Sequence, residues 1–279
     1  IGKLSSFSMD SSLTSLHPSP VFGPVHSRRL GVSLGINLMP GDGKLCSFDC
    51  VYCECGTNGE RSPHTARPSR EAVVRTLENV LRTRHAAGQP LHTLTFSGNG
   101  EPTLHPEFPG IIDDVLTLRN RWYPEAKVSV LSNATAIHRP QVREALMKVD
   151  NNIQKLDTVS DAYIHMIDRP APSYRVEDTI RYLCCFEGHV IVQTIFMSGH
   201  LTLRWTGSDA EETFDADNTS ETYLQPWLQA LQRIRPQGVM VYTIDRPTPF
   251  PTLTKVLPET LDAIAARVRA LGIPCSVSY

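Results

Sequence analysis

Three cysteines in the segment Cys46-Ser-Phe-Asp-Cys50-Val-Tyr-Cys53 are the residues of this chain best suited to chemistry. Their C-x3-C-x2-C spacing supplies three thiolates and no fourth cysteine at a matching interval. Three thiolates suit a [4Fe-4S] cluster, because they bind three irons and leave the fourth iron open to another ligand. A structural zinc site would instead require four closed ligands. The segment therefore predicts an iron-sulfur cluster with one reactive iron.

The other cysteines leave two alternatives to weigh. Cys55 stands two residues after the segment and would allow a four-cysteine zinc site, although zinc sites usually pair C-x2-C units at a distance. A disulfide framework is disfavoured, because seven cysteines is an odd number and the chain opens with no secretory signal. We therefore expect a cytoplasmic protein in which Cys184, Cys185 and Cys275 are small buried hydrophobic residues.

Composition is that of an ordinary globular protein with a sizeable core. The chain has 279 residues, 41% of them hydrophobic, and a formal net charge of -2, so it offers no global basic field for nucleic acid. No apolar run is long enough to cross a membrane. Ile1–Ser8 resembles a cloning remnant, with Met9 as the expected native start. We expect residues 1–20 to be this remnant and an extended lead-in, and residues 21–279 to form one domain.

Strand-like and helix-like patterns alternate along the chain. Strands are expected near 31–39, 92–96, 127–131, 152–156, 190–196, 239–244 and 274–278, and helices near 70–87, 106–120, 139–148, 176–186, 221–234 and 258–271. The polar segment 198–220 indicates a long loop. Such alternation is typical of an α/β fold with a parallel sheet and helices outside.

Polar motifs follow the expected strands. They are the cysteine segment, Gly98-Asn99-Gly100-Glu101-Pro102, Ser132-Asn133, Lys155-Leu156-Asp157 and Thr243-Ile244-Asp245-Arg246. In barrel-type α/β folds, functional residues gather at the C-terminal ends of the strands. These motifs are therefore expected to meet at one edge of the sheet.

The cysteine segment, with Tyr52 before its last cysteine, and the GNGE motif at 98–101 resemble the radical S-adenosylmethionine (SAM) superfamily. The resemblance implies a partial (β/α)6 TIM barrel. It also implies that SAM chelates the open iron and is cleaved to methionine and a 5′-deoxyadenosyl radical. Three segments (FGPVHSRRLGVSLGINL, KLD and VYTIDRPTP) resemble the Fe-S oxidoreductase group related to wyosine-synthesis enzymes, some members of which resemble queuine lyases. Glu54-Cys55 departs from the Gln-Leu usual there.

Site residues can be assigned on this basis. The metal ligands are Cys46, Cys50 and Cys53, and the candidate SAM-binding residues are Tyr52, Gly98, Asn99, Gly100, Glu101, Ser132, Asn133 and Gln193. The candidates for orienting substrate are Lys155, Asp157, Asp245 and Arg246. Structural alternatives are a tight turn at 98–101, a helix cap at 132–133, a surface ion pair between Lys155 and Asp157, and an ion pair stiffening the loop at 245–249. Arg28 and Arg29 are candidates for binding phosphate or carboxylate.

The resulting expectation is a SAM-cleaving enzyme acting on a small molecule or modified nucleobase, with queuine-lyase-like salvage of a deazapurine as its most specific form. An electron donor such as flavodoxin or ferredoxin is implied. The alternatives are a radical SAM enzyme that modifies a base within tRNA, and a zinc-stabilised binding protein without turnover.

Overall fold

The computed structural model describes residues 4–6, 14–27, 31–205 and 211–279 of the chain. The candidate anion-binding residues Arg28 and Arg29 lie outside the described residues. Within the described residues, no helix combines the length and apolar character needed to cross a membrane.

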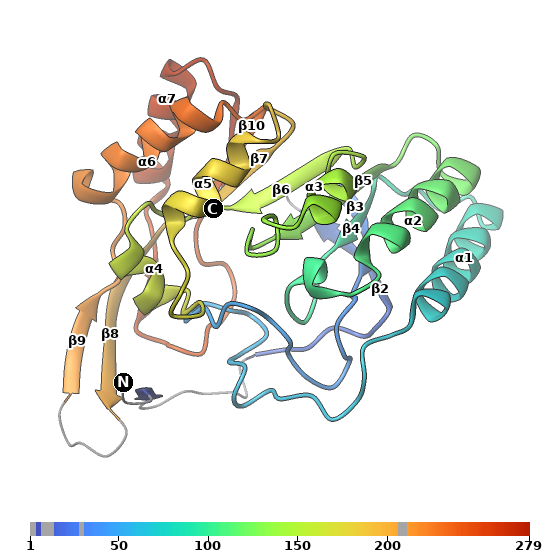
Figure 1. Cartoon of the computed structure of the whole chain (residues 1–279), viewed down its shortest axis with the longest axis horizontal. Helices are drawn as coiled ribbons and strands as arrows, with labels where there is room; N and C mark the ends of the chain where they lie inside the picture. The colour runs from blue at the N-terminus through green and yellow to red at the C-terminus, as the bar shows by residue number, and fades with distance from the viewer. Residues whose placement is uncertain (1–3, 7–13, 28–30, 206–210) are drawn as a thin grey trace.

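One curved sheet of eight strands forms the centre of the fold (Figure 1). Its order is β12-β10-β7-β6-β5-β4-β3-β2. The strands are β2 (Val21–Ser27), β3 (Gly31–Ile36), β4 (Thr93–Phe96), β5 (Lys127–Ser132), β6 (Asn151–Lys155), β7 (Ile191–Ile195), β10 (Gly238–Tyr242) and β12 (Cys275–Ser278). All neighbours are parallel except β2, which pairs antiparallel with β3. The predicted partial α/β barrel is confirmed.

Helices cover the outer face of this sheet (Figure 1). They are α1 (Arg70–Ala86), α2 (Phe108–Trp122), α3 (Pro140–Leu146), α4 (Asp161–Ile167), α5 (Val176–Cys184), α6 (Glu221–Ile234) and α7 (Pro258–Ala270), with a short 3-10 helix η2 (Pro102–Leu104). Ser69 caps α1, because its side chain accepts a hydrogen bond from the Ala72 amide. Val73, Leu77 and Leu81, spaced at the helical period, are fully buried against the sheet side.

Side-chain alternation along the strands separates an apolar outer face from a polar interior. Leu94 and Phe96 belong to the main hydrophobic core, whereas Thr93 and Thr95 lie on the opposite face of β4. Thr95 Oγ1 lies 2.8 Å from Ser33 Oγ, so hydroxyl groups bond to one another across the strands. The inside of the partial barrel is therefore lined partly by small polar side chains.

The predicted loop at 198–220 is wrong. This region contains β8 (Met197–Trp205) and β9 (Glu211–Asp215), which form an antiparallel pair that β1 (Leu4–Ser6) and β11 (Leu253–Lys255) extend into a second sheet. Most side chains of β8 and β9 are polar, so the sequence lacks the alternation of apolar and polar residues that marks a strand. Only a few of these side chains, such as that of Leu201 opposite Phe214, face the interior. The strands β2 and β11 and the helix α4 were also not predicted, since their stability depends on tertiary contacts rather than on a local pattern.

Candidate active site

The cysteine loop follows β3 and lies over the C-terminal ends of the strands. A bridge between Leu45 and Gly100 joins the start of the loop to the segment after β4. On the other side, the Asp49 amide donates to the Asp168 carbonyl oxygen, beyond the end of α4, at 2.8 Å. The loop is thus anchored to two distant parts of the chain. This anchoring holds the cysteines at the edge of the sheet where the sequence predicts the site.

Two of the predicted cluster ligands have a donor from another strand end beside their sulfur. Asn133 Nδ2, after β5, lies 3.5 Å from Cys46 Sγ. Lys155 Nζ, at the end of β6, lies 3.3 Å from Cys50 Sγ. Burial raises the pKa of Cys46 to about 11 and that of Cys50 well above its ordinary value, and Lys155 opposes the shift at Cys50. Hydrogen-bond donors at the sulfurs are suited to thiolates that carry iron.

Cys53 has its donor within the same loop. The Cys55 thiol donates to the Cys53 sulfur, and this hydrogen bond lowers the pKa of Cys53 while it raises that of Cys55. Cys55 Sγ also lies 3.5 Å from the Gly98 carbonyl oxygen and 4.0 Å from Asn99 Oδ1. All three predicted ligands therefore have one donor each, and Cys55 supports Cys53.

A buried lysine adds positive charge beneath the cysteine loop. The Lys44 side chain is only 2% exposed and donates to the Gly56 carbonyl oxygen at 2.8 Å. Burial acts to lower the pKa of Lys44, but the three cysteines and Asp49 outweigh it and hold the pKa above its ordinary value. Lys44 thus offsets part of the negative charge that three thiolates would bring.

No group of three or more His, Cys, Asp or Glu side chains is arranged around a single metal ion in the described parts of the chain. Cysteines of a [4Fe-4S] cluster bind separate irons and need not surround one point, whereas the four ligands of a structural zinc meet at one ion. Three thiols on one loop, each with its own donor and with buried cations nearby, are a donor set that fits the cluster.

A buried network joins Tyr52 to the end of β6 and to α4. Tyr52 Oη accepts from Lys155 Nζ at 2.6 Å, donates to an Asp157 carboxylate oxygen, and lies 2.9 Å from Asp168 Oδ1. Lys155 Nζ is 3.5 Å from Asp168 and 3.8 Å from Asp157. The ion pair between Lys155 and Asp157 that the sequence suggests is present, but it is not a surface pair, because the Asp157 side chain is 0% exposed. Burial raises the pKa of Asp157 to about 7, and Lys155 limits the rise.

The glycines at 98 and 100 allow close approach of the backbone to other parts of the protein. Gly98 has φ +129° and a Cβ there would lie 2.7 Å from the Asn37 side chain. Gly100 has φ +141° and a Cβ there would lie 1.9 Å from the Leu45 carbonyl oxygen. A larger residue at position 98 would therefore clash with Asn37, and one at position 100 would displace the cysteine loop at Leu45. The motif is both a tight turn and the support of that loop.

Asn99 binds the lead-in segment with its side chain. Its Oδ1 accepts from the His17 amide at 2.7 Å, and its Nδ2 donates to the carbonyl oxygens of His17 and Pro40, both at 2.8 Å. The Asn99 side chain is fully buried. Residues 14–20, expected to lie outside the domain, are consequently fixed against the site.

Glu101 positions the loop after β5. It is buried, and its carboxylate accepts from the Asn133 amide at 2.6 Å and the Thr103 amide at 3.0 Å. Ser132 Oγ accepts from the Ala134 amide at 3.0 Å. Burial raises the pKa of Glu101, although these hydrogen bonds act in the other direction. Glu101 and Ser132 therefore shape the turn that brings Asn133 to Cys46.

A cavity of about 520 Å³ opens beside the cysteine loop, inside the partial barrel. Among the predicted site residues, its walls include Tyr52, Cys53, Gly98, Gln193, Asp245 and Arg246. Lys155 and Asp157 are not among its lining residues. The structure therefore brings Lys155 and Asp157 to the cysteine loop and leaves Asp245 and Arg246 at the mouth of the cavity.

Ion pairs at this mouth differ from the one considered from sequence. Arg246 pairs with Glu54 of the cysteine loop at 3.0 Å, and Asp245 pairs with Lys255 at 3.6 Å. His17 also lines the cavity, and burial followed by the charge of Arg246 lowers its pKa. Sequence reasoning missed His17 and Asp168, and no local pattern marks either residue.

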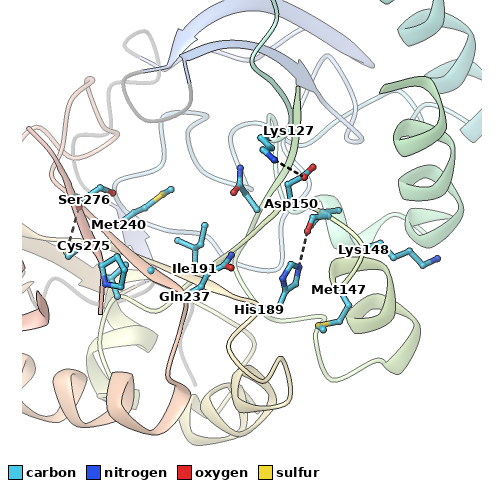
Figure 2. A pocket seen from close by; sticks show the side chains of 15 residues that line it. Lys127, Met147, Lys148, Asp150, His189, Ile191, Gln237, Met240, Cys275 and Ser276 are labelled. Atoms are coloured by element: carbon cyan, nitrogen blue, oxygen red, sulfur yellow. Dashed lines mark hydrogen bonds and ion pairs between the residues drawn. The ribbon is translucent and has the colours of Figure 1, made fainter. Parts of the chain in front are cut away.

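A second hollow of about 780 Å³ lies at the opposite ends of the strands. Figure 2 shows Lys127 directed at Asp150 there, with Met147 and His189 nearby. His189 Nε2 lies 2.9 Å from the Val149 carbonyl oxygen. The hollow is far along the strands from Cys46, Cys50 and Cys53, and none of the predicted site residues lines it.

Comparison with known proteins agrees with this geometry. The Radical SAM superfamily model matches residues 42–264. A UPF0026 protein of Synechocystis sp. is 30% identical over 82% of this chain and 77% of its own length, and one of Helicobacter pylori is 28% identical over 84% of this chain and 69% of its own length.

Solved structures share the fold at low sequence identity. A radical SAM methyltransferase from Sphaerobacter thermophilus matches with a TM-score of 0.63 and 15% identity, over 88% of this chain and 66% of that chain. Streptococcus suis SuiB bound to S-adenosylmethionine matches with a TM-score of 0.59 and 13% identity, over 87% of this chain and 50% of that chain. This chain thus spans between half and two thirds of these structures. With the match to the superfamily and to the UPF0026 proteins, it belongs to the radical SAM superfamily, whose enzymes use a [4Fe-4S] cluster and SAM.

Proposed function

We propose that Cys46, Cys50 and Cys53 hold the cluster and that the enzyme abstracts hydrogen from a small polar substrate bound in the 520 Å³ cavity. The observation that carries the proposal is the position of this cavity, which Cys53 and Gly98 line from the cysteine side and Gln193 lines from the strands. A modified nucleobase, such as a deazapurine, is the most specific substrate class that we propose.

When bound, the cluster and SAM supply the 5′-deoxyadenosyl radical that abstracts the hydrogen atom. The protein supplies binding, orientation and exclusion of water. The Gly98 carbonyl oxygen is a candidate acceptor for the SAM ammonium group, since Gly98 lines the cavity and this oxygen lies 3.5 Å from Cys55 Sγ. Gln193, on the inner face of β7, is a candidate to hydrogen-bond the ribose or the substrate.

The size of the cavity supports a small substrate. Pockets for small molecules and cofactors measure about 300–1,000 Å³. A cavity of about 520 Å³ that must also admit SAM leaves room for a compact molecule. Its mouth carries both signs of charge, from Glu54, Asp245 and Arg246, which suits a polar substrate more than a polyanion.

The test is anaerobic reconstitution with iron and sulfide, followed by EPR of the dithionite-reduced protein with and without SAM. We expect a [4Fe-4S]+ signal that changes when SAM is added. Cys46→Ala should lose the cluster, while Cys275→Ala, a change at the far end of the sheet, should retain it. Unchanged iron content in Cys46→Ala would refute the ligand assignment. A colourless protein holding one zinc would favour the binding-protein alternative.

Substrate class is tested separately. Reconstituted enzyme, with dithionite or a flavodoxin or ferredoxin as donor, is incubated with SAM and deazapurine bases, and release of 5′-deoxyadenosine is measured. We expect stimulation by a free base. Stimulation only by tRNA, with binding that weakens steeply as salt increases, would replace the free-base proposal with the tRNA alternative.

A further inference from the structure

Lys155 is the charged member of the three donors beside the cysteine sulfurs. The other two donors, the Asn133 amide and the Cys55 thiol, are neutral groups. The Lys155 ammonium lies 3.3 Å from Cys50 Sγ, and its side chain is 19% exposed. It does not line the cavity in which substrate is proposed to bind. The contacts of Lys155 therefore indicate a role at the cysteine loop rather than in binding substrate.

Four other side chains hold the ammonium in this position. It donates to Tyr52 Oη at 2.6 Å and pairs with Asp168 at 3.5 Å and Asp157 at 3.8 Å. It also lies 4.7 Å from the centre of the Tyr52 ring and 5.7 Å from that of Phe48. Contacts from the cysteine loop, β6 and α4 thus fix one cation against one sulfur.

The position of a charge beside a cluster sulfur affects the energy of its reduction. Adding one electron makes the cluster more negative, and reduction potentials depend on net charge and on hydrogen bonds to the sulfurs. A fixed ammonium that donates to a ligand sulfur stabilises the reduced form more than the oxidised form. Asp157 and Asp168 offset part of this charge through space, but as carboxylates they do not replace the hydrogen bond to sulfur.

We propose that Lys155, held by Tyr52 and Asp168, is a positioning residue that raises the reduction potential of the cluster through its contact with Cys50. This role rests on the proposed assignment of Cys50 as a cluster ligand. In this role Lys155 makes it easier for the cluster to accept an electron from the external donor. The role replaces the orientation of substrate that the sequence suggests for Lys155.

The test is an anaerobic EPR titration of the cluster potential in reconstituted protein without SAM. Lys155→Met removes the charge and the hydrogen bond, and should shift the midpoint potential to more negative values. Lys155→Arg keeps a cation and a donor, and should remain close to wild type. Lys127→Met removes an exposed lysine at the opposite ends of the strands and should cause no shift.

The iron content of wild type and of each variant distinguishes failure of the proposed function from failure of the proposed role of Lys155. If wild-type protein forms no cluster, the proposed function fails before the role of Lys155 is reached. If Lys155→Met loads poorly, Lys155→Gln keeps a neutral donor in the buried site and should still have a more negative potential than Lys155→Arg. Equal midpoint potentials in loaded wild type, Lys155→Arg and the neutral variant would overturn the proposal.

Discussion

Arg246 Nη1 donates to Glu54 Oε2 at 3.0 Å and so joins residues that are 192 positions apart in the chain. Glu54 follows the last predicted cluster ligand, and Arg246 follows β10, so the ion pair ties the cysteine loop to the opposite wall of the cavity. Glu54 also stands where the sequence departs from the pattern of the group that it resembles. The residue at which this chain departs from that pattern therefore forms the ion pair that joins the cysteine loop to the cavity wall.

Breaking this ion pair should open the cavity with little loss of stability. The two side chains are 55% and 46% exposed, so Arg246→Gln should change the free energy of unfolding by about 0–1 kcal/mol. Alkylation of Cys55 in cluster-free protein, followed by peptide mass spectrometry, should become faster. Arg181→Gln, which breaks an exposed pair with Asp178 elsewhere, is the matched control. An unchanged alkylation rate in Arg246→Gln would show that the pair does not limit access.

Removing the Tyr52 hydroxyl should destabilise the protein. Tyr52→Phe leaves Lys155, Asp157 and Asp168 without their shared partner in a buried site, and losing a buried hydrogen-bond partner costs about 1–3 kcal/mol. Urea unfolding of cluster-free protein measures the effect. Tyr123→Phe, which loses one bond to the Gln89 carbonyl oxygen at the surface, should have a smaller effect. Equal losses in the two variants would contradict a coupled network.

Cys55 should be dispensable for cluster content. It donates to Cys53 and does not complete a four-ligand site, so Cys55→Ala should load as much iron as wild type while Cys53→Ala loses it. Iron and sulfide analysis after anaerobic reconstitution distinguishes the two variants. Loss of iron from Cys55→Ala equal to that from Cys53→Ala would make Cys55 a ligand.

Glu101 should make stability fall as pH rises. Burial raises its pKa above the ordinary 4.5, so the folded protein holds this proton more tightly than the unfolded chain. The contribution is complete below the unfolded pKa and is lost as pH rises through the folded pKa. Stability of wild type relative to Glu101→Gln should therefore decrease as pH rises above about 4.5, until Glu101 is ionised in the folded protein as well. The exposed Glu125→Gln is the control, and a pH-independent difference for Glu101→Gln would contradict the raised pKa.

Local patterns in the sequence were sufficient for the barrel framework. Apolar residues at the helical period predict α1, and short stretches rich in apolar residues predict β4 and β5, because residues close together in the sequence form the buried faces of these elements. The same alternation predicts that the cysteine segment and the GNGE motif meet at one edge. The long polar region that forms β8 and β9 was missed, since its pairing with β1 and β11 joins distant parts of the chain.

The identity of the candidate ligands could be obtained from spacing alone, because the three cysteines lie within eight residues of sequence. Which groups surround them was decided by the tertiary structure. The sequence around Lys155 and Asp157 does not indicate whether these side chains face substrate or the cysteine loop. Asp168 contacts Lys155 only because α4 packs against that loop. Hydrogen bonds and charges act over a few ångströms in space, so residues more than 100 positions apart, such as Lys155 and Cys50, become partners only in the folded chain.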